Sequence, residues 1–511
     1  MLAVHWQGVS DAAAQSLLDA DIAPHLHDIL GGTELDALCE RLAQSLRAAG
    51  YLVAQVLVTP DDRERFLQSG ELRLTVFEGK VGAISVRNSS RVSDERIKAV
   101  TTKALCPDGV GDQCVLSASK MERAQLLLQD LPGVNLEPVE LGPQGVAVGQ
   151  TAVGVIAEQS QPLVGGYVGV DNYGYPTTGV GELTAGVTLT NLFHAGDVLQ
   201  ASGMVTNRHQ GMGSVLGSMP IGYSGLRAQL GYNHMLYSVP QVGASGYADT
   251  VFGGVTYPLT RGLDRNWTVG LDGVSTTSHQ EVDGVQAFAP RWIAAGRVTL
   301  AGNAGDRPIA LGQSYWSGSA SWMFGHVAQD LGGAKDVTGQ LGGFNKFNLN
   351  ALGKLDLGSS NWYVLGNLRA QYATSNLDAS QKLVMGGQNG VRAYRPDEGS
   401  LDSGIVLSVE LRRVFTLPNG DRISAGPIFD YATGVVNQHP YAHWQTMLGY
   451  SNPSLSNHRA LASWGIGVDY VSQSGYSAGL TWSNRLPGGA DSVNYPGSAR
   501  NRFLASVSMK F

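Results

Sequence analysis

The sequence is poor in charge and has no long apolar runs. Only 15% of its 511 residues are charged, well below the quarter that is usual in globular proteins. No stretch approaches the roughly 18 consecutive apolar residues of a membrane-spanning helix. The net charge of −7 gives no sign of the basic surface that nucleic-acid binding requires. These absences exclude a helical membrane protein and argue against both an ordinary soluble enzyme and a nucleic-acid-binding protein.

Motifs for catalysis and cofactor binding are also lacking. There is no phosphate-binding loop and no dinucleotide-binding fingerprint. Residues 475–479 match the hydrolase pattern G-x-S-x-G, but the helix that this motif requires after the serine is not predicted. Pro440, between His439 and His443, breaks any helix that would align the two imidazoles on a metal ion. We therefore expect no enzymatic activity, no metal and no cofactor.

Cysteine is scarce, with three residues in the chain. Cys106 and Cys114 flank a turn-rich segment, which favours a short disulfide loop in an oxidising compartment, with two unpaired surface thiols as the alternative. Cys39 lies in a helical pattern and is expected to be buried. The first six residues lack the basic and apolar regions of a secretory signal. Such a signal would lie before this numbering, or the assigned start codon would be too late.

Glycine, by contrast, is abundant, with 67 residues, and the periodicity of the sequence changes near residue 158. Before that point, helical and strand periods alternate. They predict two small α/β units over residues 1–80 and 81–158, each with a strand, two helices and further strands. In the second unit, Ser93 is predicted to cap one helix, and Ser119, with Glu122 three residues later, to cap the next. Each unit would leave a strand edge open to bind an extended polypeptide.

After residue 158 the sequence follows the period of two that is typical of strands. Apolar residues such as Trp464 and Ile466 alternate with small or charged ones such as Ser463 and Asp469. A water-filled lumen requires charge on one face of so many strands, whereas the core of a soluble β-sandwich or β-propeller, the alternative, does not. Turn signals separate about sixteen strands, an even number as in bacterial barrels. We therefore predict an antiparallel sixteen-stranded transmembrane β-barrel over residues 159–511.

The predicted strands begin near residues 162, 178, 197, 213, 226, 245, 265, 292, 315, 347, 361, 404, 423, 460, 475 and 502. The last of them carries Phe503, Val507 and Phe511 on one face, and Phe511 ends the sequence. A terminal aromatic residue in register with a lipid-facing stripe is similar to the C-terminal signal by which outer-membrane barrels are recognised for assembly.

Two α/β units followed by such a barrel resemble the two-partner secretion transporters, which share a superfamily with the barrel-assembly insertase. The pairs Gly50-Tyr51 and Glu78-Gly79 follow the pattern of that family's first POTRA domain, and residues 131–134 (Leu-Pro-Gly-Val) fit its second. Residues 391–394 (Val-Arg-Ala-Tyr) resemble the superfamily's Val-Arg-Gly-Tyr motif. They lie in the long sixth external loop, around 375–403, between the eleventh and twelfth predicted strands.

The resemblance implies a gate inside the barrel. The sixth loop would fold back into the lumen, and Arg392 would pair with an aspartate of a barrel strand. The matching position is Asp430, on the thirteenth predicted strand. Val391 and Tyr394 would pack the loop tip. Ala393 and Ala432 stand where the family has glycine, and a β-carbon there would strain a backbone of positive φ.

The resemblance also implies a function in the bacterial outer membrane. The chain would secrete a β-helical exoprotein with an N-terminal secretion domain, such as an adhesin, a cytolysin or a contact-dependent toxin. Its periplasmic POTRA domains would bind this partner, and folding outside would drive export. Outer-membrane lipids and the barrel-assembly machinery would be further partners, and a barrel without open edges favours a monomer. An outer-membrane insertase and a passive porin are the alternatives.

Overall fold

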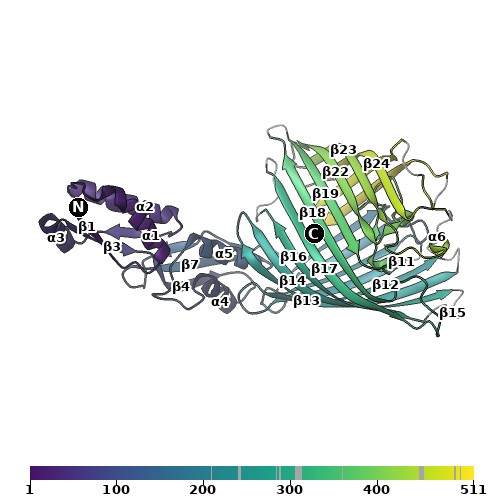
Figure 1. Ribbon diagram of the computed structural model, residues 1–511, viewed down its shortest axis with the longest axis horizontal. Helices are drawn as coiled ribbons and strands as arrows, with labels where there is room; N and C mark the ends of the chain where they lie inside the picture. The colour runs from purple at the N-terminus through teal and green to yellow at the C-terminus, as the bar shows by residue number, and fades with distance from the viewer. Residues whose placement is uncertain are drawn as a thin grey trace. The chain divides into compact units, whose positions relative to one another are not determined.

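The computed structural model describes residues 1–160, 162–208, 210–239, 243–282, 285–286, 289–304, 313–358, 361–447, 454–487, 491–494 and 497–511. The chain forms two compact units, whose strands and helices are labelled in Figure 1. One unit contains Met1–Pro162 with the short segments Asn191–Gly196 and Pro220–Gly225, and the other contains the rest of the chain. Within the described ranges, no helix is both long and apolar enough to cross a membrane.

The first unit begins with three helices packed on a three-stranded sheet. The sheet has the order β1-β3-β2, with β1 parallel and β2 antiparallel to β3. A stripe of buried leucines at helical spacing on α2, Leu35, Leu38, Leu42 and Leu46, forms its core. The elements are β1 (Ala3–Gln7), α1 (Ala12–Ile22), α2 (Gly32–Ala48), β2 (Gln55–Leu57), α3 (Pro60–Ser69) and β3 (Glu71–Phe77).

A second sheet with two helices follows. Strand β7 is central, parallel to β4 and antiparallel to β5 and β6. Ser93 caps α4 as predicted, because its side chain accepts a hydrogen bond from the backbone N–H of Arg96. The elements are β4 (Lys80–Asn88), α4 (Asp94–Leu105), α5 (Ala118–Gln129), β5 (Val134–Leu136), β6 (Glu140–Gly142) and β7 (Gln150–Gln159).

The predicted cap of α5 was wrong. The helix begins at Ala118, so that Ser119 already lies inside it, and Ser117 is the N-cap. The Ser117 side chain accepts from the backbone N–H of Lys120, and the backbone of Ser117 has the extended conformation that an N-cap requires.

Cys106 and Cys114 form a disulfide whose Cα atoms are 5.2 Å apart. It joins the end of α4 to the segment before α5, and both residues are buried in the core beneath these helices. Cys39 is a free thiol buried on α2. Burial raises the pKa of this thiol to about 11, which keeps it protonated and unreactive at neutral pH.

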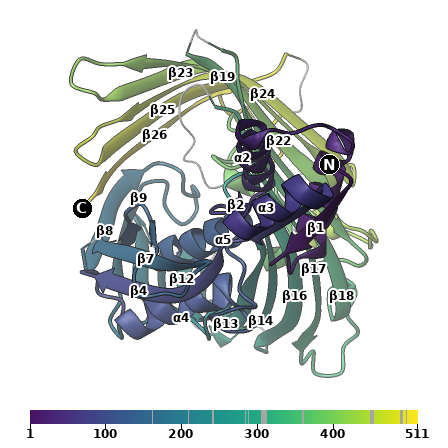
Figure 2. The same ribbon diagram turned by 90° about the vertical axis from the view of Figure 1, so that its left-hand side faces the viewer.

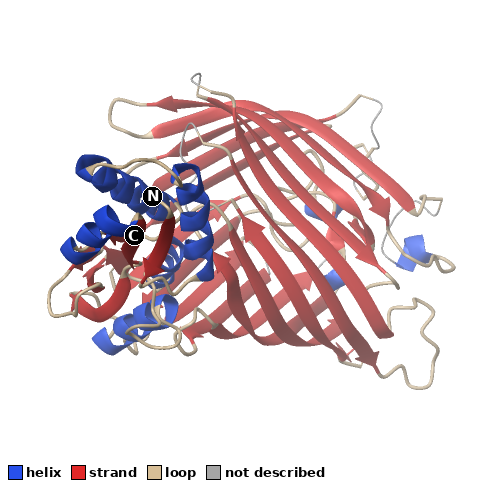
Figure 3. Cartoon of the chain, turned by 60° about the vertical axis from the view of Figure 1, so that its left-hand side comes forward, coloured by secondary structure: helices blue, strands red, loops and turns tan. Residues whose placement is uncertain are grey.

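The second unit is a closed antiparallel barrel. Consecutive strands pair around the barrel, and the last strand, β26, pairs with the first, β8, to close it. In Figure 3 the red strands surround the lumen. The long strands are β8 (Val164–Asp171), β9 (Glu182–Thr190), β10 (Val198–Thr206), β11 (Gln210–Pro220), β12 (Arg227–Val239), β13 (Ala244–Arg261), β14 (Asn266–Val282), β16 (Arg291–Asn303), β17 (Tyr315–Gln329), β18 (Gly342–Asp356), β19 (Trp362–Ala373), β22 (Ser403–Thr416), β23 (Arg422–Val435), β24 (His458–Val471), β25 (Tyr476–Arg485) and β26 (Asn501–Lys510).

These sixteen long strands confirm the prediction of a sixteen-stranded barrel. The two-residue β15 (Val285–Gln286) pairs with β14 as a short extension. Each predicted start lies close to the observed one, and the largest difference is at β18, predicted near 347 and beginning at Gly342. The strands alternate as expected: on β24, Trp464 and Ile466 are exposed on the outer surface, whereas Ser463 is buried toward the lumen.

Candidate functional site

In the first α/β module, residues 1–79, two residues that match the family pattern, Glu78 and Gly79, connect the start of the chain to the end of β3. The Glu78 side chain is buried, and its carboxylate accepts hydrogen bonds from the backbone N–H groups of Ser10 at 2.8 Å and Asp11 at 2.9 Å. Gly79 has a φ of 80°, and a β-carbon there would lie 2.3 Å from Cγ2 of Val53. The Glu78-Gly79 pair therefore holds the module together.

Tyr51 supports the same junction. Its hydroxyl donates to the Asp11 carboxylate at 2.8 Å. This hydrogen bond lowers the pKa of Asp11, helped by the backbone N–H of Ala13. Burial, followed by the hydrogen bond to Asp11, raises the pKa of Tyr51 to about 12. Both family-like pairs of this module thus have a structural role.

The sixth loop of the barrel, residues 374–402, connects β19 to β22 and folds into the lumen. It contains the 3-10 turns η3 (Ala379–Gln381) and η4 (Pro396–Glu398) and the short strands β20 (Leu383–Val384) and β21 (Ser400–Leu401), which pair with each other. Its apolar side chains form a buried cluster with lumen-facing residues of β22, β23 and β24: Val406, Ala432 and Leu461. The loop is therefore packed on the inner wall of the barrel.

Arg392 of this loop lies between two carboxylates of the wall. Its Nη2 is 2.5 Å from Oε1 of Glu410 on β22, whereas its Nη1 is 3.6 Å from Oδ1 of Asp430 on β23. The structure thus brings Arg392 and Asp430 together, but the closest carboxylate to the guanidinium is that of Glu410. The guanidinium therefore approaches Asp430 through Nη1 at 3.6 Å rather than through a close bidentate contact.

Asp430 binds the loop backbone more closely than the arginine head. Its Oδ2 accepts from the backbone N–H of Arg392 at 3.1 Å and from the Ser463 hydroxyl at 3.3 Å, and its Oδ1 accepts from the Ser408 hydroxyl at 2.9 Å. The residue is completely buried. Since each carboxylate oxygen has partners, Asp430 can fix the position of the loop backbone at a low cost of desolvation.

A second arginine extends the network along the wall. Arg412 of β22 is 2.6 Å from Oε2 of Glu410 and 3.0 Å from Oδ2 of Asp469 on β24. Charges therefore alternate from Asp430 through Arg392, Glu410 and Arg412 to Asp469. Such a row offsets the desolvation of each charge better than an isolated pair would. In the sequence, Glu410 lies between Val409 and Leu411, so strand periodicity indicates the polar face of the strand, but it gives no signal for the contact with the loop.

The other two motif residues pack the loop tip. Val391 and Tyr394 are completely buried. The Arg485 guanidinium lies 4.8 Å from the centre of the Tyr394 ring, and Arg502 of β26 donates to the Tyr394 carbonyl at 2.9 Å. The motif therefore spans the lumen wall from β22 to β26.

The expected strain at the two alanines was wrong. Both are described, and neither is among the residues of positive φ. Ala393 and Ala432 are buried in the same cluster as Val391. Their backbones take conformations that any residue adopts, so a β-carbon is accommodated at both positions.

The base of the loop has anchors of its own. Lys382 pairs with Asp402 at 2.9 Å, and Arg459 of β24 pairs with Glu398 at 3.2 Å; all four side chains are almost completely buried. Glu398 also accepts from the backbone N–H of Val493, in the loop before β26, at 2.7 Å. The tip and the base of the loop are thus held by separate sets of ion pairs.

Two further predicted residues, Phe511 and Ser477, lie directly after β26 and on β25. Phe511 is exposed on the outer surface and exchanges backbone hydrogen bonds with Gly166, where the C-terminus meets β8 (Figure 2). Ser477, from the hydrolase-like pattern, lies on β25, and its hydroxyl oxygen is 2.7 Å from the hydroxyl oxygen of Ser508 on β26. The strand-to-helix turn of a hydrolase is not formed there.

Comparisons with known proteins agree with this architecture. The model of the haemolysin secretion/activation protein family ShlB/FhaC/HecB matches residues 149–470. The heme/hemopexin transporter protein HuxB of Haemophilus influenzae strain 86-028NP is 22% identical, over 95% of this chain and 84% of that protein. The outer membrane transporter CdiB of Escherichia coli is 24% identical, over 80% of this chain and 69% of that protein.

Solved structures share the fold. CdiB from Escherichia coli superposes with a TM-score of 0.76 at 19% identity, over 100% of this chain and 90% of that one. BamA from Haemophilus ducreyi lacking POTRA domains 1–3 gives a TM-score of 0.54 at 15% identity, over 99% of both chains. Because the family match covers well over half of the sequence and includes both Arg392 and Asp430, the chain belongs to the haemolysin secretion/activation protein family, the outer-membrane transporters of two-partner secretion.

Proposed function

We propose that this chain secretes an exoprotein through the lumen of its barrel, and that the sixth loop is the gate. The observation that carries the proposal is how the loop is held. Its tip is fixed by ion pairs and hydrogen bonds of Arg392 to Glu410 and Asp430. Competing polar groups can replace such contacts one at a time, so a polypeptide entering the lumen can displace the tip without unfolding the barrel.

The α/β modules, which we interpret as POTRA domains in the periplasm, supply the binding step. Strand β4 is at the end of its sheet order, and β7 pairs with one of its edges. Beyond the bridge from Lys80 to Val115, the other edge of β4 has no strand partner among the described residues. An extended polypeptide can add to this edge through backbone hydrogen bonds, which makes few demands on its sequence.

The partner that fits this route is an unfolded exoprotein with an N-terminal secretion domain, which folds into a β-helix outside the cell. An adhesin, a cytolysin and a contact-dependent toxin all meet this description. Because nucleotide is absent from the periplasm, folding at the surface would supply the driving force. The closed barrel has no free edge for self-association, so we propose a monomer, surrounded by outer-membrane lipids and inserted by the barrel-assembly machinery.

The test compares the proteins in the medium of cells with and without the chain. One polypeptide should depend on the chain for its release, and this identifies the partner. Deletion of residues 1–158 should abolish that release, whereas heat-modifiable migration on gels should show that the barrel is still assembled. Normal release without residues 1–158 would contradict the proposal.

The same experiment separates the alternatives. An insertase would change the amounts of many outer-membrane proteins and release no single polypeptide. A passive porin would pass small solutes equally well without residues 1–158.

A further inference from the structure

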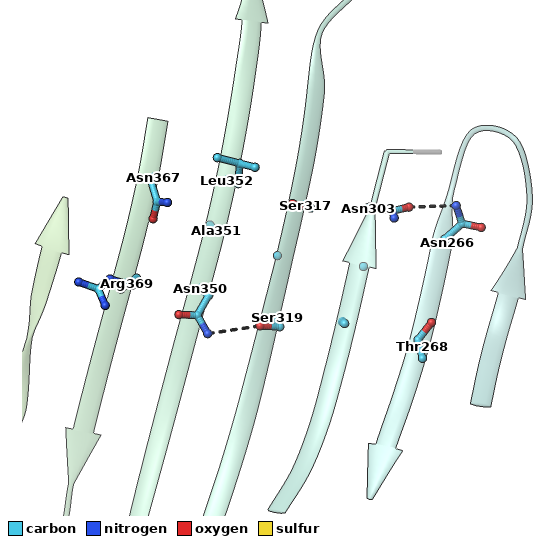
Figure 4. A pocket seen from close by; sticks show the side chains of 13 residues that line it. Asn266, Thr268, Asn303, Ser317, Ser319, Asn350, Ala351, Leu352, Asn367 and Arg369 are labelled. Atoms are coloured by element: carbon cyan, nitrogen blue, oxygen red, sulfur yellow. Dashed lines mark hydrogen bonds between the residues drawn. The ribbon is translucent and has the colours of Figure 1, made fainter. Parts of the chain in front are cut away.

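One part of the lumen wall is polar and carries a single charged side chain, Arg369, at the edge where it meets the sixth loop. Its lining residues come from the neighbouring strands β14, β16, β17, β18 and β19, and Figure 4 shows their side chains. A recess of about 430 Å³ lies on this wall, and no described residue of the sixth loop lines it. We call it the amide wall; its polar lining is Asn266, Thr268, Asn303, Ser317, Ser319, Asn350, Asn367 and Arg369.

The register of the strands arranges these side chains in two adjacent rows across the barrel. One row runs through Asn266, Asn303, Ser317, Leu352 and Asn367. The next row runs through Thr268, Ala301, Ser319, Asn350 and Arg369. With strands about 4.8 Å apart, five strands give each row a length of roughly 19 Å, enough for several residues of an extended chain.

Much of the hydrogen-bonding capacity of the wall is unused. The wall makes few internal hydrogen bonds, such as Asn266 to Asn303 at 2.9 Å and Asn350 to Ser319 at 3.4 Å (Figure 4). In the described part of the chain, the side chains of Thr268, Ser317 and Asn367 make none. Amide and hydroxyl groups both donate and accept, so they suit the alternating N–H and C=O groups of a peptide backbone.

The amide wall ends at the gate. Asn367 is paired in register with Ser408, and Ser408 with Asp430. The first row therefore continues directly into the residues that hold the loop tip. In the second row, Arg369 of the wall donates a hydrogen bond to the carbonyl of Asn389, on the tip of the sixth loop. Arg369 thus lines the amide wall and also contacts the tip of the sixth loop.

We propose that the amide wall is the track for the extended secreted polypeptide, and that Arg369 couples occupation of the track to release of the loop tip. A substrate carbonyl that reaches Arg369 replaces the Asn389 carbonyl as its acceptor. The loop tip then loses its contact with β19 and is held only on the β22–β26 side. This proposal rests on the proposed function and specifies the path of the substrate within it.

Apart from Arg369 at its edge, the wall is neutral, which suits a substrate that must keep moving. Fixed charges would hold oppositely charged segments of the substrate and repel others, whereas single neutral hydrogen bonds exchange with water at a small net cost. The track therefore binds any sequence weakly.

The experiment is site-specific crosslinking to a stalled substrate. The probe is the partner identified by its release into the medium, with single cysteines in its N-terminal region and a tightly folded domain fused at its C-terminus to stall transport. The full-length chain carries Cys39→Ala and either Ser319→Cys, on the amide wall, or Ser214→Cys. Ser214 is a matched control, because it pairs with Ser202 in the lumen on β10 and β11, away from the wall.

Crosslinks at Ser319→Cys that exceed those at Ser214→Cys several-fold would support the track. Equal yields, or a higher yield at Ser214→Cys, would overturn it, whereas the proposed secretion would stand. An absence of crosslinks at both sites while the unfused partner is still released would overturn the track together with passage through the lumen. If no partner depends on the chain for release, the proposed function itself fails.

The coupling role of Arg369 has a separate readout. In planar bilayers without substrate, Arg369→Gln should increase the open fraction several-fold, because the loop tip loses its contact at Asn389. Arg297→Gln is the control, because the Arg297 guanidinium on β16 pairs with Asp272 on β14 and with no described residue of the loop. An unchanged open fraction in Arg369→Gln, or an equal increase in both variants, would overturn the coupling.

Discussion

The guanidinium of Arg392 lies closer to Glu410 than to Asp430, at 2.5 Å against 3.6 Å. Asp430 instead accepts the backbone N–H of the arginine. The two carboxylates thus hold different parts of the loop, one the side chain and the other the main chain. Removing either should loosen the tip through a different contact.

Glu410→Gln should open the channel more often than Asp272→Asn, a matched carboxylate-to-amide change that breaks an ion pair with Arg297 on the barrel wall, away from the loop. Loss of the carboxylate leaves Arg392 and Arg412 without their shared partner, and breaking a buried pair of this kind costs about 3–5 kcal/mol. The Arg392 side chain is 11% exposed, and this contact with solvent reduces the free-energy cost. We therefore expect at least a tenfold rise in open fraction in planar bilayers. A channel that stays closed would show that Glu410 does not hold the loop.

Reversing the charges of Arg392 and Asp430 together should not restore a closed channel. In the double variant Arg392→Glu with Asp430→Arg, the new carboxylate at 392 would face Glu410 at close range, and like charges repel. The open fraction should be at least as high as in Arg392→Ala. A closed channel in the double variant would indicate that the pair with Asp430 alone sets the position of the loop.

Acid should loosen the first α/β module. The hydrogen bond from Tyr51 lowers the pKa of Asp11 in the folded state, so this group contributes stability above its unfolded pKa of about 3.9. That stability is lost as the pH falls through the lowered folded-state pKa. Hydrogen exchange of residues 1–79 in the full-length chain should therefore accelerate as the pH falls below 4, after correction for the intrinsic rate.

Asp11→Asn is the control for this pH effect. It removes the titrating group, so its exchange should already be faster at neutral pH and should change less on acidification than that of the unsubstituted chain. Equal pH dependence in both chains would assign the effect to other carboxylates.

Reduction should destabilise the second module. The Cys106–Cys114 disulfide closes a loop across eight positions, and a loop of this length stabilises a fold by about 2–3 kcal/mol. With reductant, or in Cys106→Ser with Cys114→Ser, proteases should cut residues 80–159 faster, and the barrel should be unaffected. Equal protease resistance with and without reductant would contradict a structural role for this bond.

The barrel could be predicted from sequence because its strands are specified by short stretches of sequence. The alternation of residues such as Trp464 and Ser463 indicates which face of a strand meets lipid. Turn residues separate the strands, so the position of each strand start could be predicted. The helices of the first module were harder. Helix α3 buries Phe66 but is otherwise largely polar, so its apolar stripe is too narrow to recognise. The first module therefore has three helices where two were predicted.

The contacts of the proposed gate were only partly predictable, for a different reason. Arg392 and Asp430 were found through a motif, whereas Glu410 and Arg369 are two of several charged residues on inward faces. Which of them contact the loop depends on how a loop of nearly thirty residues folds inside the barrel. The periodicity of the strands does not predict the conformation of this loop.

The most direct test of the gate is to fix the loop tip to the wall reversibly. Asn389 and Asn367 line one recess between the tip and β19, so Asn389→Cys with Asn367→Cys, in a Cys39→Ala chain, can be joined by a short photocleavable bis-maleimide, which leaves the Cys106–Cys114 disulfide intact. Crosslinked chains should not release the partner, and cleavage of the crosslinker by light should restore release in the same cells. Release at the normal rate with the crosslink intact would contradict the proposed gate, because the polypeptide would then pass without movement of the loop.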